Sequence, residues 1–150
     1  MERKCYHIPT LPTGTTVATV DWNVVPAAQI DTYRWLDGGY EPHAEARLAF
    51  LPGYGFALRM SCIERSPRAI YSGYNEPVYT DSCLEFFAAW AEGSPTHDRR
   101  YMNMEMNARG TLLSCLGTDR HARVPVRDIT GGSIPDVRGE ILPDRWSVTA

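Results

Sequence analysis

Short stretches of alternating apolar and polar residues run along the chain, separated by glycine and proline. Within residues 45–51, apolar side chains occupy every second position: Ala46, Leu48 and Phe50. Side chains two apart point to the same face of a strand, so this segment predicts a strand with one apolar face. The turn sequence Pro52-Gly53-Tyr54-Gly55 follows, and residues 56–64 then predict the second strand of a hairpin.

Several further segments carry the same signature. Residues 100–107 and 111–116 predict a second hairpin, joined by a short turn that contains glycine. Residues 82–90 are the most apolar run and predict a central strand, with a short helix as the alternative, and residues 145–150 begin another strand. Residues 27–36 predict a helical turn or an irregular loop. Many short strands between turns are typical of an all-β protein, and we expect an antiparallel β-sandwich of the jelly-roll or immunoglobulin-like type.

Composition narrows the class of protein. The 150 residues include 12 glycines and 11 prolines, and the longest stretch without either, residues 78–92, is 15 residues long. These numbers exclude a coiled coil and a transmembrane helix of about 20 apolar residues. We expect one domain over residues 1–150. The net charge of -3 provides no basic surface for nucleic acid or an anionic membrane, so neither is an expected partner.

The N-terminus and the cysteines indicate the environment of the chain. No apolar stretch follows the basic start Arg3-Lys4, so we expect no signal peptide in this chain. The chain as given is therefore expected in the cytoplasm, or outside the cell if it is a mature fragment. The four cysteines, at 5, 62, 83 and 115, form no C-x-x-C pair and are interpreted as small apolar free thiols, with a disulfide as the alternative. The four tryptophans, at 22, 35, 90 and 146, are interpreted as packing residues.

The strand over residues 100–107 has two chemically distinct faces. Its methionines, Met102, Met104 and Met106, line one face, which we expect in the core. The other face carries Asn103, Glu105 and Asn107. Carboxamides donate and accept hydrogen bonds while a carboxylate accepts them, and this set matches the vicinal hydroxyls of a sugar. The alternative is a polar face that is solvated or bonded to neighbouring loops.

A second polar group lies at the start of the strand over residues 82–90. In an extended chain Asp81, Cys83 and Glu85 share one face, and Glu85 is a carboxylate within an apolar strand. Such a group needs a partner, which is an arginine, a metal or a ligand hydroxyl. Tyr79 precedes this strand, and its flat ring is suited to stacking on the apolar face of a pyranose. Its alternative role is loop packing.

The carboxylates in these two strands allow two other functions, glycoside hydrolysis and calcium binding. Glu85 and Glu105 lie on successive predicted strands, so we expect them to be near neighbours, and a pair of carboxylates is the machinery of a small glycosidase. Asp81 is a candidate ligand for a structural calcium ion, although no contiguous calcium loop is present.

Two segments together resemble carbohydrate-binding module family 9 and its bacterial, DOMON-like relatives. They are Pro77-Val78-Tyr79-Thr80-Asp81-Ser82-Cys83-Leu84-Glu85-Phe86-Phe87 and Tyr101-Met102-Asn103-Met104-Glu105-Met106-Asn107-Ala108-Arg109-Gly110-Thr111-Leu112. The resemblance implies an antiparallel β-sandwich that binds plant-polysaccharide sugars without catalysis. It also implies structural calcium, a parent or partner glycoside hydrolase, and strands beyond Ala150. A haem or redox role on a DOMON-like sandwich is the remaining alternative.

The resemblance also assigns roles to individual residues. The family has tryptophan where this chain has Tyr79, and that aromatic residue stacks on the sugar. The carboxylate that bonds the sugar hydroxyls corresponds to Glu85, and the polar face of the next strand contributes Asn103, Glu105 and Asn107. The expected ligand is therefore a mono- or oligosaccharide bound by these five residues.

Overall fold

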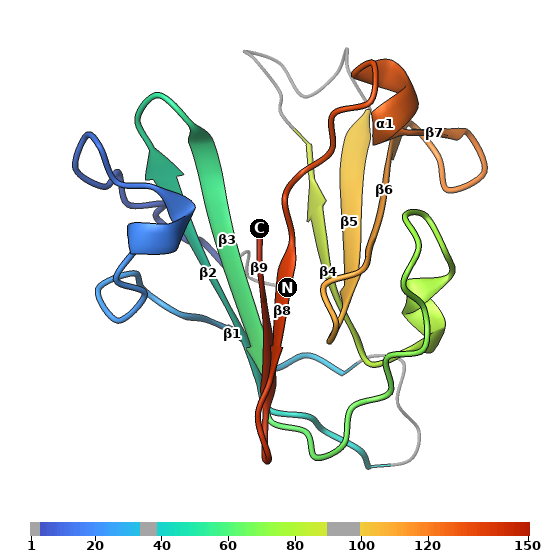
Figure 1. Ribbon diagram of the computed structural model, residues 1–150. Helices are drawn as coiled ribbons and strands as arrows, with labels where there is room; N and C mark the ends of the chain where they lie inside the picture. The colour runs from blue at the N-terminus through green and yellow to red at the C-terminus, as the bar shows by residue number, and fades with distance from the viewer. Residues whose placement is uncertain (1–3, 34–38, 90–99) are drawn as a thin grey trace.

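A computed structural model describes residues 4–33, 39–89 and 100–150 of the protein. Two antiparallel sheets face each other as the layers of a sandwich (Figure 1), which confirms the predicted all-β fold class. The first sheet has the order β1-β2-β3-β9-β8, and the second has the order β4-β5-β6-β7. The strands of the first sheet are β1 (Ala28–Ile30), β2 (Ala44–Leu51), β3 (Gly55–Cys62), β9 (Trp146–Thr149) and β8 (Arg138–Ile141). Those of the second are β4 (Cys83–Ala88), β5 (Tyr101–Asn107), β6 (Leu112–Gly117) and β7 (Arg123–Pro125).

Helical structure in the described ranges is limited to single turns. These are η1 (Val17–Thr19), η2 (Val78–Thr80) and α1 (Val126–Ile129). Among the residues described, no helix has the length and apolar character needed to cross a membrane.

Both predicted hairpins are present in the structure. Strands β2 and β3 pair antiparallel through Leu48 and Leu58, and β5 pairs with β6 through Met104 and Ser114. The apolar run over residues 82–90 forms strand β4 and not a helix, as far as the described residues extend.

Three strands, β1, β7 and β8, differ from the sequence expectation. The helical turn or loop predicted over residues 27–36 is wrong at its start, because Ala28–Ile30 forms β1 and pairs with β2 through Gln29 and Glu45. A three-residue strand is too short to show periodicity, so only pairing with a neighbour reveals it. The sequence does not predict β7 or β8 either, because β7 is three residues long and all four residues of β8 are exposed and carry no apolar alternation.

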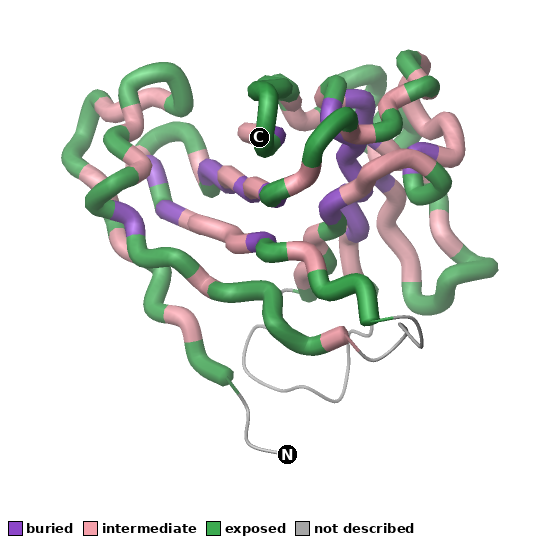
Figure 2. The backbone as a smooth tube through the Cα atoms, turned by 90° about the horizontal axis from the view of Figure 1, so that it is seen from below, coloured by how far each residue is buried: buried purple, intermediate pink, exposed green. Residues whose placement is uncertain are grey.

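The core lies between the two sheets. Leu84, Met104 and Met106 from one sheet pack with side chains from the other, and Met106 is 0% exposed, which confirms the methionine face as core. Trp146 and Val148 of β9 contribute from the opposite layer and are each 1% exposed. Figure 2 shows the buried backbone positions concentrated on the strands and the exposed ones on the connecting loops.

The two sheets meet closely at one glycine pair. Gly110, with φ of +85°, turns the chain between β5 and β6, a backbone conformation that favours glycine. A Cβ atom on Gly110 would lie 2.5 Å from the backbone nitrogen of Gly139 in β8. Glycine at both positions therefore lets the β5–β6 turn touch the edge strand of the other sheet.

None of the four cysteines forms a disulfide. Cys62 is buried, Cys83 and Cys115 are partly buried, and Cys5 is exposed. Loss of solvation raises the pKa of Cys83 to about 12 and that of Cys62 to about 11, so both are protonated thiols. Trp146 is a packing residue as predicted, whereas Trp35 and Trp90 lie outside the described residues.

Candidate functional site

A pocket of about 520 Å³ opens on the outer face of the second sheet, the face turned away from the core. It brings together three of the five site residues that the sequence predicts: Tyr79, Glu85 and Glu105. The other lining residues are Phe87, Tyr101, Leu113, Arg120, His121 and Arg123. The segment before β4, which carries Tyr79, runs along the outer side of this sheet (Figure 1).

Glu85 and Glu105 are directly opposite each other in the pairing of β4 with β5, which confirms that they are neighbours. Like charges at directly opposite strand positions repel each other. Loss of solvation in the pocket and the charge of Glu105 raise the pKa of Glu85, while Arg123 acts in the opposite direction. The Nη1 atom of Arg123, a residue of β7, lies 3.9 Å from Oε1 of Glu105 and compensates part of this negative charge.

Tyr79 extends from the single turn η2, and 59% of it is exposed. The turn is fixed by Val78, which is 0% exposed, and by the Thr80 hydroxyl, which donates to the carbonyl of Pro77 at 3.0 Å. Because the neighbouring residue is anchored in the interior, the ring of Tyr79 is held at the surface beside the carboxylates. An exposed ring in this position is able to stack on a flat apolar surface.

Asn103 supports the pocket from below. It is 0% exposed and does not line the pocket. Its amide nitrogen donates to Oε1 of Glu105 at 2.9 Å, and its amide oxygen accepts from the backbone of Cys115 at 3.2 Å. The geometry therefore makes Asn103 a residue that orients the Glu105 carboxylate.

Asn107 lies at the far end of the same strand face and holds the backbone around it. It is 0% exposed, donates to the carbonyl of Tyr71 at 2.9 Å, and accepts from the backbone nitrogen of Thr111 at 3.0 Å. It also donates to Asp81 at 2.9 Å. These bonds place Asn107 outside the pocket and occupy the groups that would otherwise meet a ligand.

Asp81 organises the segment that carries Tyr79. Its side chain is fully buried, and Oδ2 accepts from the backbone nitrogens of Ile70 and Tyr71 at 3.0 and 3.1 Å. Burial alone would raise the pKa of Asp81. The hydrogen bonds from Asn107, Tyr71 and Ile70, together with the charge of Arg68, outweigh burial and lower that pKa.

A calcium ion does not fit the surroundings of Asp81. The ion requires six to eight oxygen ligands, whereas Oδ2 faces N–H donors and Oδ1 lies 3.3 Å from Nε of Arg68. Within the described parts of the chain, no group of three or more histidine, cysteine, aspartate or glutamate side chains is placed to hold a metal.

Sequence reasoning missed several lining residues. Phe87 and Tyr101, whose ring centroids are 5.9 Å apart, lie two positions from Glu85 and Asn103 on the same strand faces. Strand alternation was therefore a sufficient signal for both. Arg123 had no such signal, because only the pairing of β7 with β6 brings it over the face.

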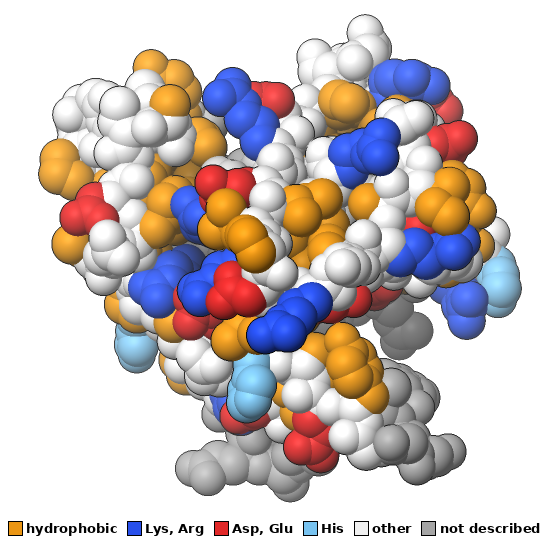
Figure 3. Space-filling model, turned by 60° about the horizontal axis from the view of Figure 1, so that its bottom comes forward, with side chains coloured by type: hydrophobic (Ala, Val, Ile, Leu, Met, Phe, Trp, Pro, Cys, Tyr) orange, Lys and Arg blue, Asp and Glu red, His pale blue; other side chains and the backbone are white. Residues whose placement is uncertain are grey.

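Acidic and basic side chains are mixed on the surface, in line with the small net charge of the chain. On the face shown in Figure 3, basic and acidic side chains lie beside one another, with hydrophobic side chains between them. No broad basic patch is visible on that face.

Two comparisons with known proteins find similar proteins, and a third finds none. A search of curated proteins finds no match. Among solved structures, a candidate carbohydrate-binding protein from Bacteroides uniformis is similar, with a TM-score of 0.69 and 25% sequence identity. The similarity covers 95% of this chain and 69% of that protein. The family model for carbohydrate-binding family 9 matches residues 15–132, more than half of the chain. The protein is therefore a member of carbohydrate-binding family 9.

Proposed function

We propose that the protein binds a mono- or oligosaccharide without catalysis, in the pocket on the outer face of β4 to β7. The observation that carries the proposal is that the exposed ring of Tyr79 lines the same pocket as the carboxylates of Glu85 and Glu105. An apolar platform beside hydrogen-bonding groups matches the two kinds of surface that a sugar ring presents. The family membership of the chain supports the same ligand class.

Each residue has a distinct part in this proposal. Tyr79 stacks on the C–H face of the sugar, while Glu85 and Glu105 accept hydrogen bonds from neighbouring hydroxyls. Arg123 donates to a hydroxyl from the opposite side of the pocket. Asn103 fixes the orientation of Glu105, and Asn107 fixes the loop beneath Tyr79, so both act on the sugar through another residue.

The same geometry disfavours glycoside hydrolysis. The acid and nucleophile of a glycosidase flank the bond that they cleave, whereas Glu85 and Glu105 stand side by side on one sheet face. Glu105 is 6% exposed and bonded to Asn103, so it has little freedom to reach an anomeric carbon. We propose a supporting role beside a glycoside hydrolase as the partner, since a binding module keeps such an enzyme near its polysaccharide.

Calorimetry with glucose, xylose, cellobiose and xylobiose tests the proposal. We expect binding by the wild-type protein, and an affinity about 5- to 30-fold weaker for Tyr79→Ala, because removal of a central aromatic side chain costs about 1–2 kcal/mol. Glu85→Gln should also weaken binding. Tyr54→Ala is the matched control, because Tyr54 is 71% exposed in the β2–β3 turn and lines no pocket described here.

Two results would overturn the proposal. One is a folded wild-type protein that releases no heat with any of these sugars. The other is release of reducing ends from polysaccharide by the wild-type protein and not by Glu85→Gln, which would make the pocket a catalytic site.

A further inference from the structure

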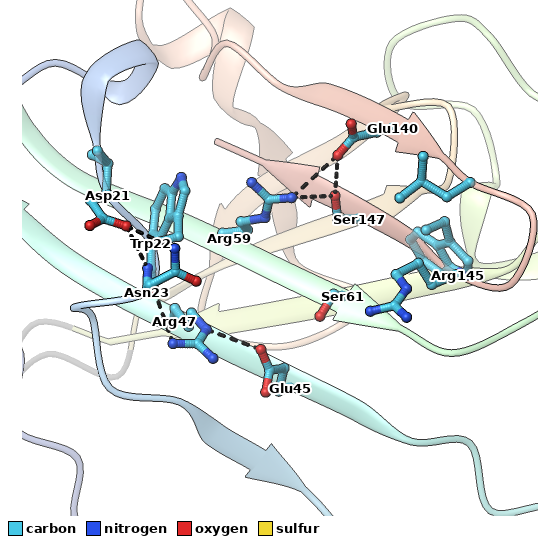
Figure 4. Close-up of a pocket in the computed structure, with 13 residues that line it drawn as sticks. Asp21, Trp22, Asn23, Glu45, Arg47, Arg59, Ser61, Glu140, Arg145 and Ser147 are labelled. Atoms are coloured by element: carbon cyan, nitrogen blue, oxygen red, sulfur yellow. Dashed lines mark hydrogen bonds and ion pairs between the residues drawn. The ribbon is translucent and has the colours of Figure 1, made fainter.

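A second hollow lies on the opposite side of the molecule, on the outer face of the first sheet. Two adjoining cavities of about 450 and 340 Å³ share the same central residues there. These shared residues are Val20, Trp22, Arg59, Glu140 and Ser147, and together the cavities form a continuous groove. We call this groove the Trp22 cleft (Figure 4).

The floor of the Trp22 cleft is a regular array of polar side chains. Strand pairing aligns one row across four strands, in the order Glu45, Ser61, Ser147 and Glu140. The next row, two residues further along each strand, has the order Arg47, Arg59, Thr149 and Arg138. With strands about 4.8 Å apart, each row spans about 14 Å. That length suits a chain of several linked rings better than one small molecule.

The lining of the cleft holds as many carboxylates as guanidinium groups, so its formal charges cancel: Asp21, Glu45, Asp136 and Glu140 against Arg47, Arg59, Arg138 and Arg145. Nη2 of Arg59 lies 3.3 Å from Oε2 of Glu140 and 3.3 Å from the hydroxyl of Ser147 (Figure 4). Nε of Arg47 donates to Glu45 at 3.0 Å. The side chains of Arg59 and Glu140 are 35% and 58% exposed, so a ligand is able to reach both. Hydroxyls, which donate and accept, fit such paired groups.

Trp22 forms one side of the cleft and is held there by its own backbone. Nη1 of Arg47 donates to the carbonyl of Trp22 at 3.0 Å and to that of Val25 at 2.5 Å. Val25 is 0% exposed and anchors the same segment. Figure 4 shows Trp22 on one side of the cleft, Arg145 on the other, and Ser61 between them. The backbone that carries the Trp22 side chain is therefore anchored beside the polar floor before any ligand binds.

We propose that the Trp22 cleft is a second saccharide-binding site, which takes a neutral oligosaccharide longer than a disaccharide. One ring of the chain stacks on Trp22, and the following rings lie across β3, β9 and β8. A polyanionic ligand is disfavoured because the four carboxylates of the lining offset its four arginines and leave no net positive charge. The residues of this cleft are separate from those of the pocket on the second sheet that Tyr79 lines, which we call the Tyr79 pocket. The protein would therefore hold two sugar chains on opposite faces.

NMR titration of the full chain with cellotetraose and xylotetraose tests the second site. The signals to follow are the indole N–H of Trp22 and the Nε–H of Arg59, assigned by comparison with Trp22→Ala and Arg59→Ala. We expect both signals to move in the wild-type protein and to move equally in Tyr79→Ala, which removes the ring of the first pocket. In Arg59→Ala the affinity measured from the Trp22 signal should fall about 10-fold.

Matched controls separate loss of binding from loss of fold. Glu140→Gln keeps the shape of an exposed side chain and should weaken binding, whereas Glu41→Gln changes an exposed glutamate outside the cleft and should not. The proposal is overturned if neither signal moves at saturating tetrasaccharide, or if only an oligosaccharide of uronic acids moves them. Because the titration is repeated in Tyr79→Ala, a failure of the first pocket leaves this result unchanged.

Discussion

The outer faces of the two sheets are built in a similar way, but the side chains that anchor their loop segments have opposite charges. On each face a loop segment lies across the strands, presents one aromatic ring, and is held by one charged side chain. On the second sheet a carboxylate, Asp81, accepts from backbone N–H groups of the segment that carries Tyr79. On the first sheet a guanidinium, that of Arg47, donates to backbone carbonyls of the segment that carries Trp22.

The polar groups beside the two rings differ in kind. Glu85 and Glu105 are like charges on paired strands, with Arg123 at 3.9 Å from Glu105. In the Trp22 cleft Arg59 and Glu140 are opposite charges 3.3 Å apart. An unbalanced pair gives a strong hydrogen-bond acceptor that depends on pH, whereas matched pairs give alternating donors and acceptors. Under the two proposals, a similar scaffold binds hydroxyls through like charges on one face and through opposite charges on the other.

The largest effect is expected from Asp81→Ala. The substitution removes the acceptor of the backbone nitrogens of Ile70 and Tyr71 and one of the two acceptors of the Asn107 amide, which is 0% exposed. We expect a loss of about 3 kcal/mol in the free energy of unfolding, measured by urea denaturation. Sugar binding at the Tyr79 pocket should be lost with it, while binding in the Trp22 cleft persists in the fraction that stays folded.

The same carboxylate should make the fold sensitive to acid. Its pKa in the folded protein is lower than in the unfolded chain, so its stabilisation is complete above the unfolded value. The stabilisation is lost as the pH falls from there through the lowered pKa of the folded state. Asp136→Ala is the control, because Asp136 is 78% exposed and should hardly change stability. Equal stability of both variants would contradict the scaffold role of Asp81.

Arg47→Ala is the corresponding change on the first sheet, with a smaller expected effect. The substitution removes the hydrogen bonds that Arg47 donates to the carbonyls of Trp22 and Val25. Because the Arg47 side chain is 24% exposed, water is able to replace some of these bonds. We expect about 2 kcal/mol less stability by urea denaturation. Tetrasaccharide binding in the Trp22 cleft should weaken and binding at the Tyr79 pocket should stay. Arg138→Ala, whose side chain is 75% exposed, should leave stability nearly unchanged. If Arg47→Ala matches it in stability, the anchoring role is wrong.

Local alternation was enough to predict much of the second sheet. The spacing of Met104 and Met106 identified the core face, and the order of the strands placed Glu85 beside Glu105. Alternation could not show that Asn103 and Asn107 are buried, because their burial comes from other segments that cover and bond them. A strand pattern states which face a side chain is on, and long-range contacts decide whether that face is open.

The Trp22 cleft was beyond prediction from the sequence for a similar reason. Trp22 was interpreted as a packing residue, since nothing near it in the chain forms a polar row. Its neighbours in the cleft, such as Arg59 and Glu140, are brought together only by the register of β3, β9 and β8. Strand β8 has no apolar alternation of its own, so its place in the sheet follows from pairing alone.

The smallest predicted effect is a pH dependence of sugar affinity, which we expect at the Tyr79 pocket and not in the Trp22 cleft. Loss of solvation and the charge of Glu105 raise the pKa of Glu85 above the ordinary value of 4.5. As the pH falls, Glu85 therefore takes up its proton earlier than an ordinary glutamate, and a protonated carboxyl is a weaker acceptor for sugar hydroxyls. Calorimetry should show the affinity of the Tyr79 pocket falling as the pH is lowered, at a higher pH than an ordinary glutamate would give. Glu85→Gln, which binds more weakly at neutral pH, should lose this dependence. If the affinity of Glu85→Gln for sugar depends on pH as much as that of the wild-type protein, another group is responsible for the titration. The pair of Glu85 and Glu105 would then not be the feature that distinguishes this face from the Trp22 cleft.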